Sequence, residues 1–158
     1  MRTAAWVGVL FAVGLTACAT AGPEANRTRF QRAVGQATPV TARELTLRIL
    51  NQYAFIIEQE QPIPNIVIQT RWKDRAPFPD EEALGIRKAQ NRMFIMARPR
   101  STTQNAEIYN VDVVIENRVM LTGSEAWTDA SATAQYQRWA NQIVEDFTRE
   151  LNVGGVRR

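Results

Sequence analysis

Carboxylates are the side chains in this sequence with the clearest capacity for chemistry. The 158-residue chain has no histidine and one cysteine, Cys18, so the serine–histidine and cysteine–histidine pairs of many hydrolases are excluded. The spacing of the acidic residues matches no EF-hand loop, and it shows no pairing suited to glycoside hydrolysis. We expect Asp80 to cap a short helical turn, and we expect no enzyme activity, metal or cofactor. The carboxylates considered are the consecutive cluster Asp80, Glu81 and Glu82, together with Glu107, Asp112 and Glu116 farther along the chain.

The segment before Cys18 has the composition of an export signal. Arg2 supplies a positive charge, and an apolar run extends from Ala4 to Leu15. This run is shorter than the roughly 20 apolar residues that a membrane-spanning helix requires, but it suits the apolar region of a signal peptide. A lone cysteine in an exported protein has no partner for an internal disulfide. Cys18 is therefore either a reactive thiol or a residue with a dedicated use.

Leu15-Thr16-Ala17-Cys18 resembles the lipobox of bacterial lipoproteins, which runs aliphatic, small, small, cysteine. The resemblance implies that the sulfur of Cys18 is diacylated, that residues 1–17 are removed as a signal peptide, and that the new amine is acylated. The protein would then be a lipid-anchored component of the bacterial cell envelope that faces the periplasm. Ala19, rather than aspartate, follows the cysteine, which favours the outer membrane over the inner membrane under the sorting rule of enteric bacteria. The alternatives are a cleaved soluble protein and a retained, uncleaved helix.

Residues 18–40 are interpreted as the lipidated cysteine and a flexible tether, because small and polar residues dominate and no apolar period is present. Arg27, Arg29 and Arg32 in this segment could contact anionic headgroups, or they could be solvated charges of a linker. Residues 41–158 then form a single domain, which is long enough to bury a core. The formal net charge of +3 is too small to indicate nucleic-acid binding.

Apolar periodicity predicts a helix at each end of this domain. The first begins at Thr41, which forms a capping box with Glu44. Residues 53–60 could continue this helix or form a short strand. The second helix carries apolar residues at spacings of three and four from Tyr136 to Leu151.

Alternating apolar residues predict consecutive strands between these helices, with a hairpin turn at Glu116-Asn117. Strands between helices indicate an α+β fold. We expect a small, mostly antiparallel sheet of three to four strands, with the N-terminal and C-terminal helices packed on one face. The predicted strands cover residues 66–74, 86–97, 106–115 and 118–127.

Candidate contacts for a partner or ligand lie on two predicted strands and the loop between them. The basic residues could grip phosphates or an acidic partner, or they could be scattered solvated charges. Phe78, in a stiff loop between two prolines, could dock a partner or anchor its own loop. Trp72, Trp127 and Trp139 could line a groove for sugar or lipid chains, or pack between sheet and helix. The proposed contacts are Arg71, Trp72, Lys73, Arg75, Phe78, Arg87 and Arg92, with Lys88 beside them.

The order of elements over residues 41–151 resembles the lipopolysaccharide-assembly lipoprotein of the outer membrane. That family has an α+β domain behind a lipidated cysteine and plugs a β-barrel partner; no motif carries its functional residues over to this chain. Together with the lipobox, the resemblance implies a non-catalytic envelope lipoprotein, an accessory or assembly subunit of a membrane protein complex. The alternative is a lipid- or glycan-binding carrier, which requires a cavity between helices and sheet. An enzyme would require a cleft with perturbed carboxylates.

Overall fold

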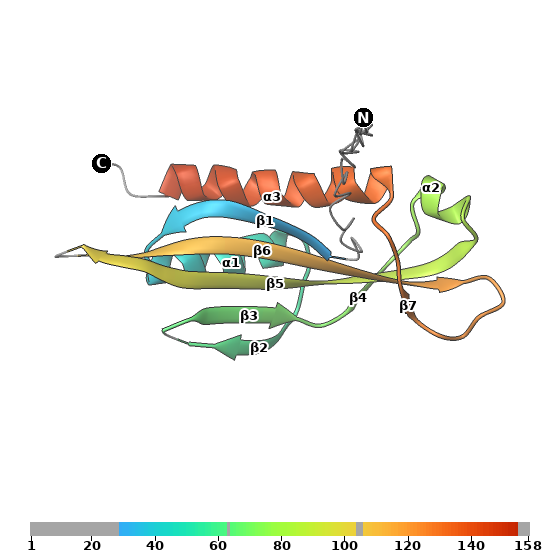
Figure 1. The fold of residues 1–158 in the computed structure, drawn as a ribbon, viewed down its shortest axis with the longest axis horizontal. Coiled ribbons are helices and arrows are strands. Elements are labelled where there is room, and N and C mark those ends of the chain that lie inside the picture. Colours follow the sequence, from blue (N-terminus) through green and yellow to red (C-terminus); the bar gives the residue numbers. More distant parts are fainter. Residues whose placement is uncertain (1–28, 63, 104–105, 155–158) are drawn as a thin grey trace, which may run out of the picture.

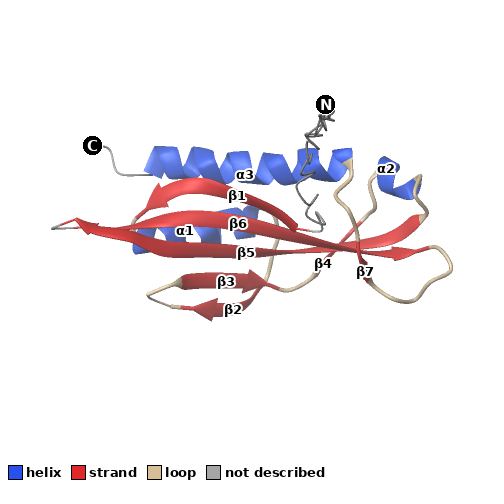
Figure 2. Ribbon diagram, viewed as in Figure 1, coloured by secondary structure: helices blue, strands red, loops and turns tan. Residues whose placement is uncertain are grey.

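The computed structural model describes residues 29–62, 64–103 and 106–154. The predicted signal peptide, the residues Leu15-Thr16-Ala17-Cys18 and the tether up to residue 28 lie outside the described residues. The described chain forms one sheet and three helices (Figures 1 and 2). The strands are β1 (Arg29–Ala37), β2 (Ile57–Gln61), β3 (Ile66–Thr70), β4 (Lys73–Arg75), β5 (Ile86–Thr103), β6 (Ala106–Leu121) and β7 (Thr128–Asp129). The helices are α1 (Pro39–Gln52), α2 (Pro79–Glu82) and α3 (Ala134–Gly154).

All neighbouring strands of the sheet are antiparallel. The order is β1-β6-β5-β3-β2, while β4 extends the pairing of β5 and β7 that of β6. β5 and β6, of 18 and 16 residues, form a hairpin that runs along the length of the molecule in Figure 1. At roughly 3.3 Å per residue these strands extend about 50–60 Å. Directly opposed residues project to the same face, so the register assigns every side chain of this hairpin to one face or the other.

One face of the sheet packs against α1 and α3. In Figure 2, α1 lies behind the strands and α3 runs along β1. Met93 and Ile95 of β5 oppose Ile115 and Val113 of β6, and all four are buried. Burying each such side chain stabilises the fold by about 1.5–3 kcal/mol. α3 meets this face with a buried stripe made of Tyr136, Ala140, Ile143, Phe147 and Leu151.

α1 begins and ends for local reasons. The Thr38 hydroxyl accepts a hydrogen bond from the Thr41 backbone N at 3.2 Å, and Pro39 follows at the first helical position. At the other end, Ala54 has a left-handed φ of 52°, which turns the chain out of the helix. Of the two alternatives for residues 53–60, the structure therefore has a strand, which begins at Ile57.

The fold class predicted from the sequence is wrong. The described residues form a seven-stranded antiparallel sheet with three helices rather than three to four strands with two helices, and strands predominate. One missed strand is β1, which lies within the segment assigned to the tether. Its buried residues Phe30, Val34 and Ala37 do not alternate, because the register shifts between Ala33 and Gly35. A bulge of this kind interrupts the alternation of buried and exposed residues, so a search for a two-residue period misses the strand.

The predicted hairpin turn was also wrong. Glu116 and Asn117 lie inside β6, opposite Arg92 and Asn91, and the chain instead reverses where Thr103 pairs with Ala106. The turn propensity of Asn117 is outweighed by the pairing of the long strand β6, in which Asn117 lies opposite Asn91 of β5. The predicted strand over residues 66–74 is in fact two strands, β3 and β4.

Candidate functional site

The second face of the sheet, opposite the described helices, is here called the open face. Its side chains form rows across the strands. In one row, Arg92 pairs with Glu116, and Glu116 pairs with Arg29. Trp72 begins the same row: Lys73 pairs with Asn91 in antiparallel strands, so the residue before Lys73 lies opposite Arg92. The next row consists of Asp74, Gln90, Arg118 and Asp129.

Arginine and aromatic side chains alternate on the open face. The Arg92 guanidinium lies 4.5 Å from the ring centre of Trp72 and 4.9 Å from that of Phe94. The Arg118 guanidinium lies 4.1 Å from the Trp72 ring centre and 5.0 Å from that of Trp127. Each cation–π contact contributes roughly 0.5–2 kcal/mol, depending on how far it is desolvated. We call Phe94, Arg92, Trp72, Arg118 and Trp127 the Arg–Trp ladder; its stacking holds two guanidinium groups in fixed orientations.

Glu116 neutralises one end of the ladder. Its Oε2 accepts a hydrogen bond from Arg92 Nε at 2.8 Å, and its Oε1 lies 2.7 Å from Arg29 Nε. Glu116 is buried, whereas the Arg29 side chain is 71% exposed. The carboxylate therefore joins the edge strand β1 to the centre of the sheet and leaves Arg92 charge-balanced.

Arg118 has a different environment. Its Nε donates to the neutral Gln90 Oε1 at 2.7 Å, and Gln90 Nε2 donates to Asp74 Oδ1 at 2.5 Å. No carboxylate of the described chain forms a salt bridge with Arg118. Partial burial, together with the nearby Arg92 charge, lowers the pKa of Arg118 from its usual value, and Asp74 opposes this shift. Arg118 is thus a partly desolvated cation whose direct partners are two indole rings and an amide.

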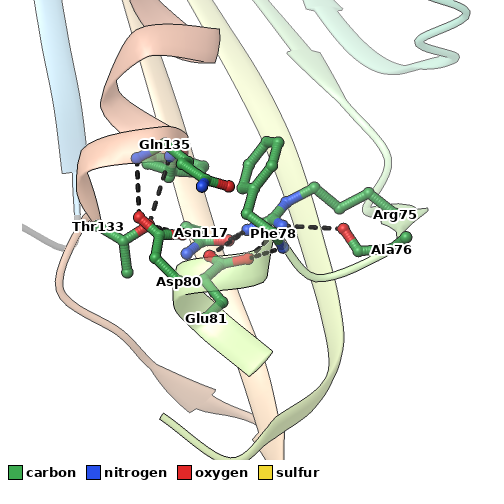
Figure 3. Close-up of polar contacts among 9 residues, drawn as sticks. Arg75, Ala76, Phe78, Asp80, Glu81, Asn117, Thr133 and Gln135 are labelled. Atoms are coloured by element: carbon green, nitrogen blue, oxygen red, sulfur yellow. Dashed lines mark hydrogen bonds and ion pairs between the residues drawn. The ribbon is translucent and has the colours of Figure 1, made fainter. Parts of the chain in front are cut away.

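A separate polar cluster is buried on the helix-covered face (Figure 3). Arg75 donates two hydrogen bonds to the fully buried Glu81, at 2.5 and 2.6 Å, and a third to Asn117 Oδ1 at 2.9 Å. Glu81 also accepts from the Phe78 backbone N at 2.9 Å. The Arg75 guanidinium lies 4.6 Å from the Phe78 ring centre. This cluster fastens α2 to the sheet.

Asp80 links α2 to the start of α3. Its Oδ1 accepts from the Thr133 hydroxyl at 3.1 Å and its Oδ2 from the Gln135 backbone N at 2.9 Å, as Figure 3 shows. A carboxylate at a helix N-terminus satisfies a free amide and interacts favourably with the helix dipole. Asp80 therefore caps α3, across the fold, rather than the short helical turn α2 in which it lies.

The structure distributes the seven proposed contacts over different parts of the molecule. Trp72 and Arg92 belong to the Arg–Trp ladder. Arg71 is exposed directly after β3. Arg87 is exposed at the N-terminal end of β5 and donates to the Ser124 carbonyl at 2.8 Å.

The remaining three proposed contacts lie away from the open face. Lys73 donates to the Tyr53 carbonyl and lies 5.1 Å from the Phe55 ring centre. Arg75 and Phe78 belong to the buried polar cluster, and the Phe78 ring packs 6.4 Å from that of Trp139. The six basic residues considered together in the sequence therefore do not form one patch.

Sequence reasoning did not propose Gln90, Glu116 or Arg118 as partner contacts, and it named Trp127 only as a residue that could line a groove for sugar or lipid chains. A signal for three of them was available, because Gln90 and Arg92 are two residues apart, as are Glu116 and Arg118. Period-two alternation places each pair on one face of a strand. The supposed turn at Glu116-Asn117 interrupted this pattern. Trp127 was expected at the end of the strand over residues 118–127, whereas the structure places it directly before β7.

The hollows of the described surface are open. One of about 300 Å³ lies between β1 and the start of α3, one of about 380 Å³ on β2 and β3, and one of about 210 Å³ beside Val40 and Pro62. Between helices and sheet, Ile49, Met93 and Phe147 are at most 1% exposed. The central part of the interface between α1, α3 and the sheet is therefore packed, and the hollow beside the start of α3 lies next to the edge strand β1.

Within residues 29–62, 64–103 and 106–154, no group of three histidine, cysteine or acidic residues could hold a metal ion. No helix in the same residues combines the length and apolar character needed to cross a membrane. Neither a scan against protein-family models nor a search of curated proteins matches this chain. Inference about its function therefore rests on its own residues.

Proposed function

We propose that this protein is a non-catalytic lipoprotein of the bacterial cell envelope, anchored through Cys18 and facing the periplasm. In this proposal it is an accessory or assembly subunit of a membrane protein complex, and the outer membrane is favoured over the inner membrane. Its partner binds the open face at the Arg–Trp ladder.

The observation that carries this proposal is the ladder. Arginine, tryptophan, phenylalanine and methionine are enriched in protein interfaces, and tryptophan and arginine dominate their energetic hot spots. On the open face the ladder is bordered by Met96, Val114 and Met120, the last two buried. A rigid, partly apolar surface of this composition loses little side-chain entropy on binding.

The position of the proposed anchor supports a partner at the membrane. Cys18 precedes Arg29 by eleven residues, and such a segment extends at most about 40 Å. Arg29 belongs to the same row of the open face as Arg92. A chain lipidated at Cys18 therefore keeps the ladder within reach of a protein embedded in, or bound to, that membrane.

A non-catalytic role is supported by composition. The chain lacks histidine, and lipidation would consume its one cysteine, which removes the usual nucleophile and base pairs. A sugar-binding role for the ladder is disfavoured, because two guanidinium groups cover the Trp72 ring.

Photo-crosslinking in native membranes tests this proposal. A crosslinking amino acid replaces Gln69, which lies opposite Phe94 on the open face, and a control replaces Arg138, which is exposed on α3. We expect one stoichiometric partner to co-purify and to crosslink from position 69 but not from position 138. A chain that stays alone, with equal background at both positions, would refute the proposed function.

A further inference from the structure

We propose that Arg118 is the residue of the open face that binds a carboxylate, and that the partner therefore presents an acidic side chain to the ladder. This inference rests on the proposed function, since it identifies the chemistry of the partner at the same surface. It is carried by the charge balance of the ladder and by the fixed orientation of one guanidinium.

The charge balance singles out Arg118. Arg92 and Arg29 already share the buried carboxylate of Glu116. Arg118 instead uses its Nε on the amide of Gln90. A guanidinium has five N–H donors, and in the described chain the Nη atoms of Arg118 donate to no acceptor and are not among the atoms buried without one. These donors therefore keep some exposure to solvent.

The orientation of this guanidinium is set before any ligand arrives. The indoles of Trp72 and Trp127 hold it at 4.1 and 5.0 Å, and the bond to Gln90 fixes its Nε edge. Planar guanidinium groups bind carboxylates through two parallel hydrogen bonds. A donor pair that is already ordered loses little entropy on binding, so this position favours a bidentate carboxylate.

Electrostatics favour an anion at the same place. Arg118 is partly desolvated and close to Arg92, and both effects oppose its charged form more strongly than the nearby Asp74 carboxylate favours it. A carboxylate placed against the Nη atoms would offset the repulsion between the two arginines. It would also restore to Arg118 the kind of partner that Arg92 already has in Glu116.

The surroundings favour a protein over a membrane surface as the source of the anion. Attraction to anionic lipids accumulates over several exposed basic side chains, at ~1 kcal/mol each. On the described part of this face, Glu116 neutralises two of the arginines and Arg118 lies between tryptophans, while Lys88 and Arg98 lie in separate rows, opposite Met120 and Asn110. One fixed guanidinium inside an aromatic border matches a single acidic side chain of a protein interface.

The test uses the protein purified from membranes and held in phosphatidylcholine nanodiscs, with the side-chain Nε–Hε NMR signal of Arg118 as the readout. The probe is a short peptide of alternating glutamate and glycine, and the same peptide with glutamine is the control. We expect the glutamate peptide to shift this signal and the glutamine peptide to leave it unchanged. Arg118→Lys keeps the charge but loses the planar fork, so it should weaken peptide binding about tenfold or more. Arg138→Lys on α3 should bind as the wild type does.

Several results would overturn the inference. One is an Arg118 signal that does not respond to the glutamate peptide. Others are a response to phosphatidylglycerol nanodiscs, or to inorganic phosphate, at least as strong as the response to the peptide. The wild-type spectrum requires no variant, so these outcomes stand even where Arg118→Lys fails to fold.

Capture from membranes separates this inference from the proposed function. A partner recovered with the wild type but lost with Arg118→Lys supports both. A partner recovered equally with both proteins overturns the role of Arg118 and leaves the proposed function intact. If the wild type captures no partner, the proposed function fails, and the peptide titration alone decides whether Arg118 binds carboxylates.

Discussion

Replacing Glu81 with alanine should remove the main polar link between α2 and the sheet. Glu81 is fully buried, and its carboxylate accepts two hydrogen bonds from Arg75 and one from the Phe78 backbone. The substitution leaves the Arg75 side chain, which is 11% exposed, without a counter-charge. Removing one member of a buried ion pair costs about 3–5 kcal/mol, and typical domains have only about 5–15 kcal/mol of unfolding free energy.

Urea unfolding followed by tryptophan fluorescence measures this loss. We expect Glu81→Ala to lower the unfolding free energy by about 3–5 kcal/mol. Glu82→Ala is the matched control, because Glu82 is the next residue of α2 and is exposed, and it should change stability by less than about 0.5 kcal/mol. Combining Glu81→Ala with Arg75→Ala should cost less than the sum of the two single changes, since each change removes the same interaction.

A small effect of Glu81→Ala on the unfolding free energy would refute this reasoning. If Glu81→Ala costs less than about 1 kcal/mol, in the range of an exposed ion pair, the Arg75–Glu81 pair is not buried as the structure has it. Additive single and double variants would likewise show that the two side chains do not interact.

Three further predictions follow from other parts of the chain. Burial raises the pKa of Tyr136, so its stabilising contribution is complete below the unfolded pKa of about 10 and is lost as pH rises through the folded pKa; urea unfolding at about pH 9 and about pH 11 should show a smaller loss for Tyr136→Phe than for the wild type, and equal losses would contradict the assignment. Gly35 has a φ of 145°, so Gly35→Ala should destabilise by about 1–3 kcal/mol, unlike the neighbouring Gln36→Ala, as chemical denaturation would show. Cys18→Ser should abolish lipid attachment, so that intact mass spectrometry finds no acyl groups and the protein leaves the membrane fraction; an unchanged mass relative to the wild type, apart from the substitution itself, would count against the lipobox.

The C-terminal helix could be predicted because its pattern is local. The period from Tyr136 to Leu151 was expected to form a helix, and this is confirmed by α3 over Ala134–Gly154, which buries both residues. β1 could not be predicted in the same way. It has few apolar residues and a bulge, and its pairing partners lie far along the chain, as Arg29 with Glu116 shows. The long-range pairing, rather than local propensity, makes this segment a strand.

By itself the sequence was sufficient for inferences that depend on neighbouring residues. The lipobox hypothesis rests on four consecutive residues ending at Cys18, and the absence of histidine limits the available chemistry wherever the chain folds. The same local information predicted that Asp80 would cap a short helical turn, which is wrong, because Asp80 lies within α2 and its N-cap is Phe78. It did not indicate that the cap would serve α3, more than fifty residues away.

Only the tertiary structure decided which arginines are available to a partner. Arg75 and Arg92 look equivalent in the sequence, yet one is buried against Glu81 and the other stacks on the open face. Arg118 meets Trp72 because β6 and β4, which follows Trp72, both pair with β5, and the register places the two side chains in neighbouring rows of the same face. Strand order and register depend on the packing of the whole sheet on α1 and α3, whereas the spacing along one strand shows only which side chains share a face.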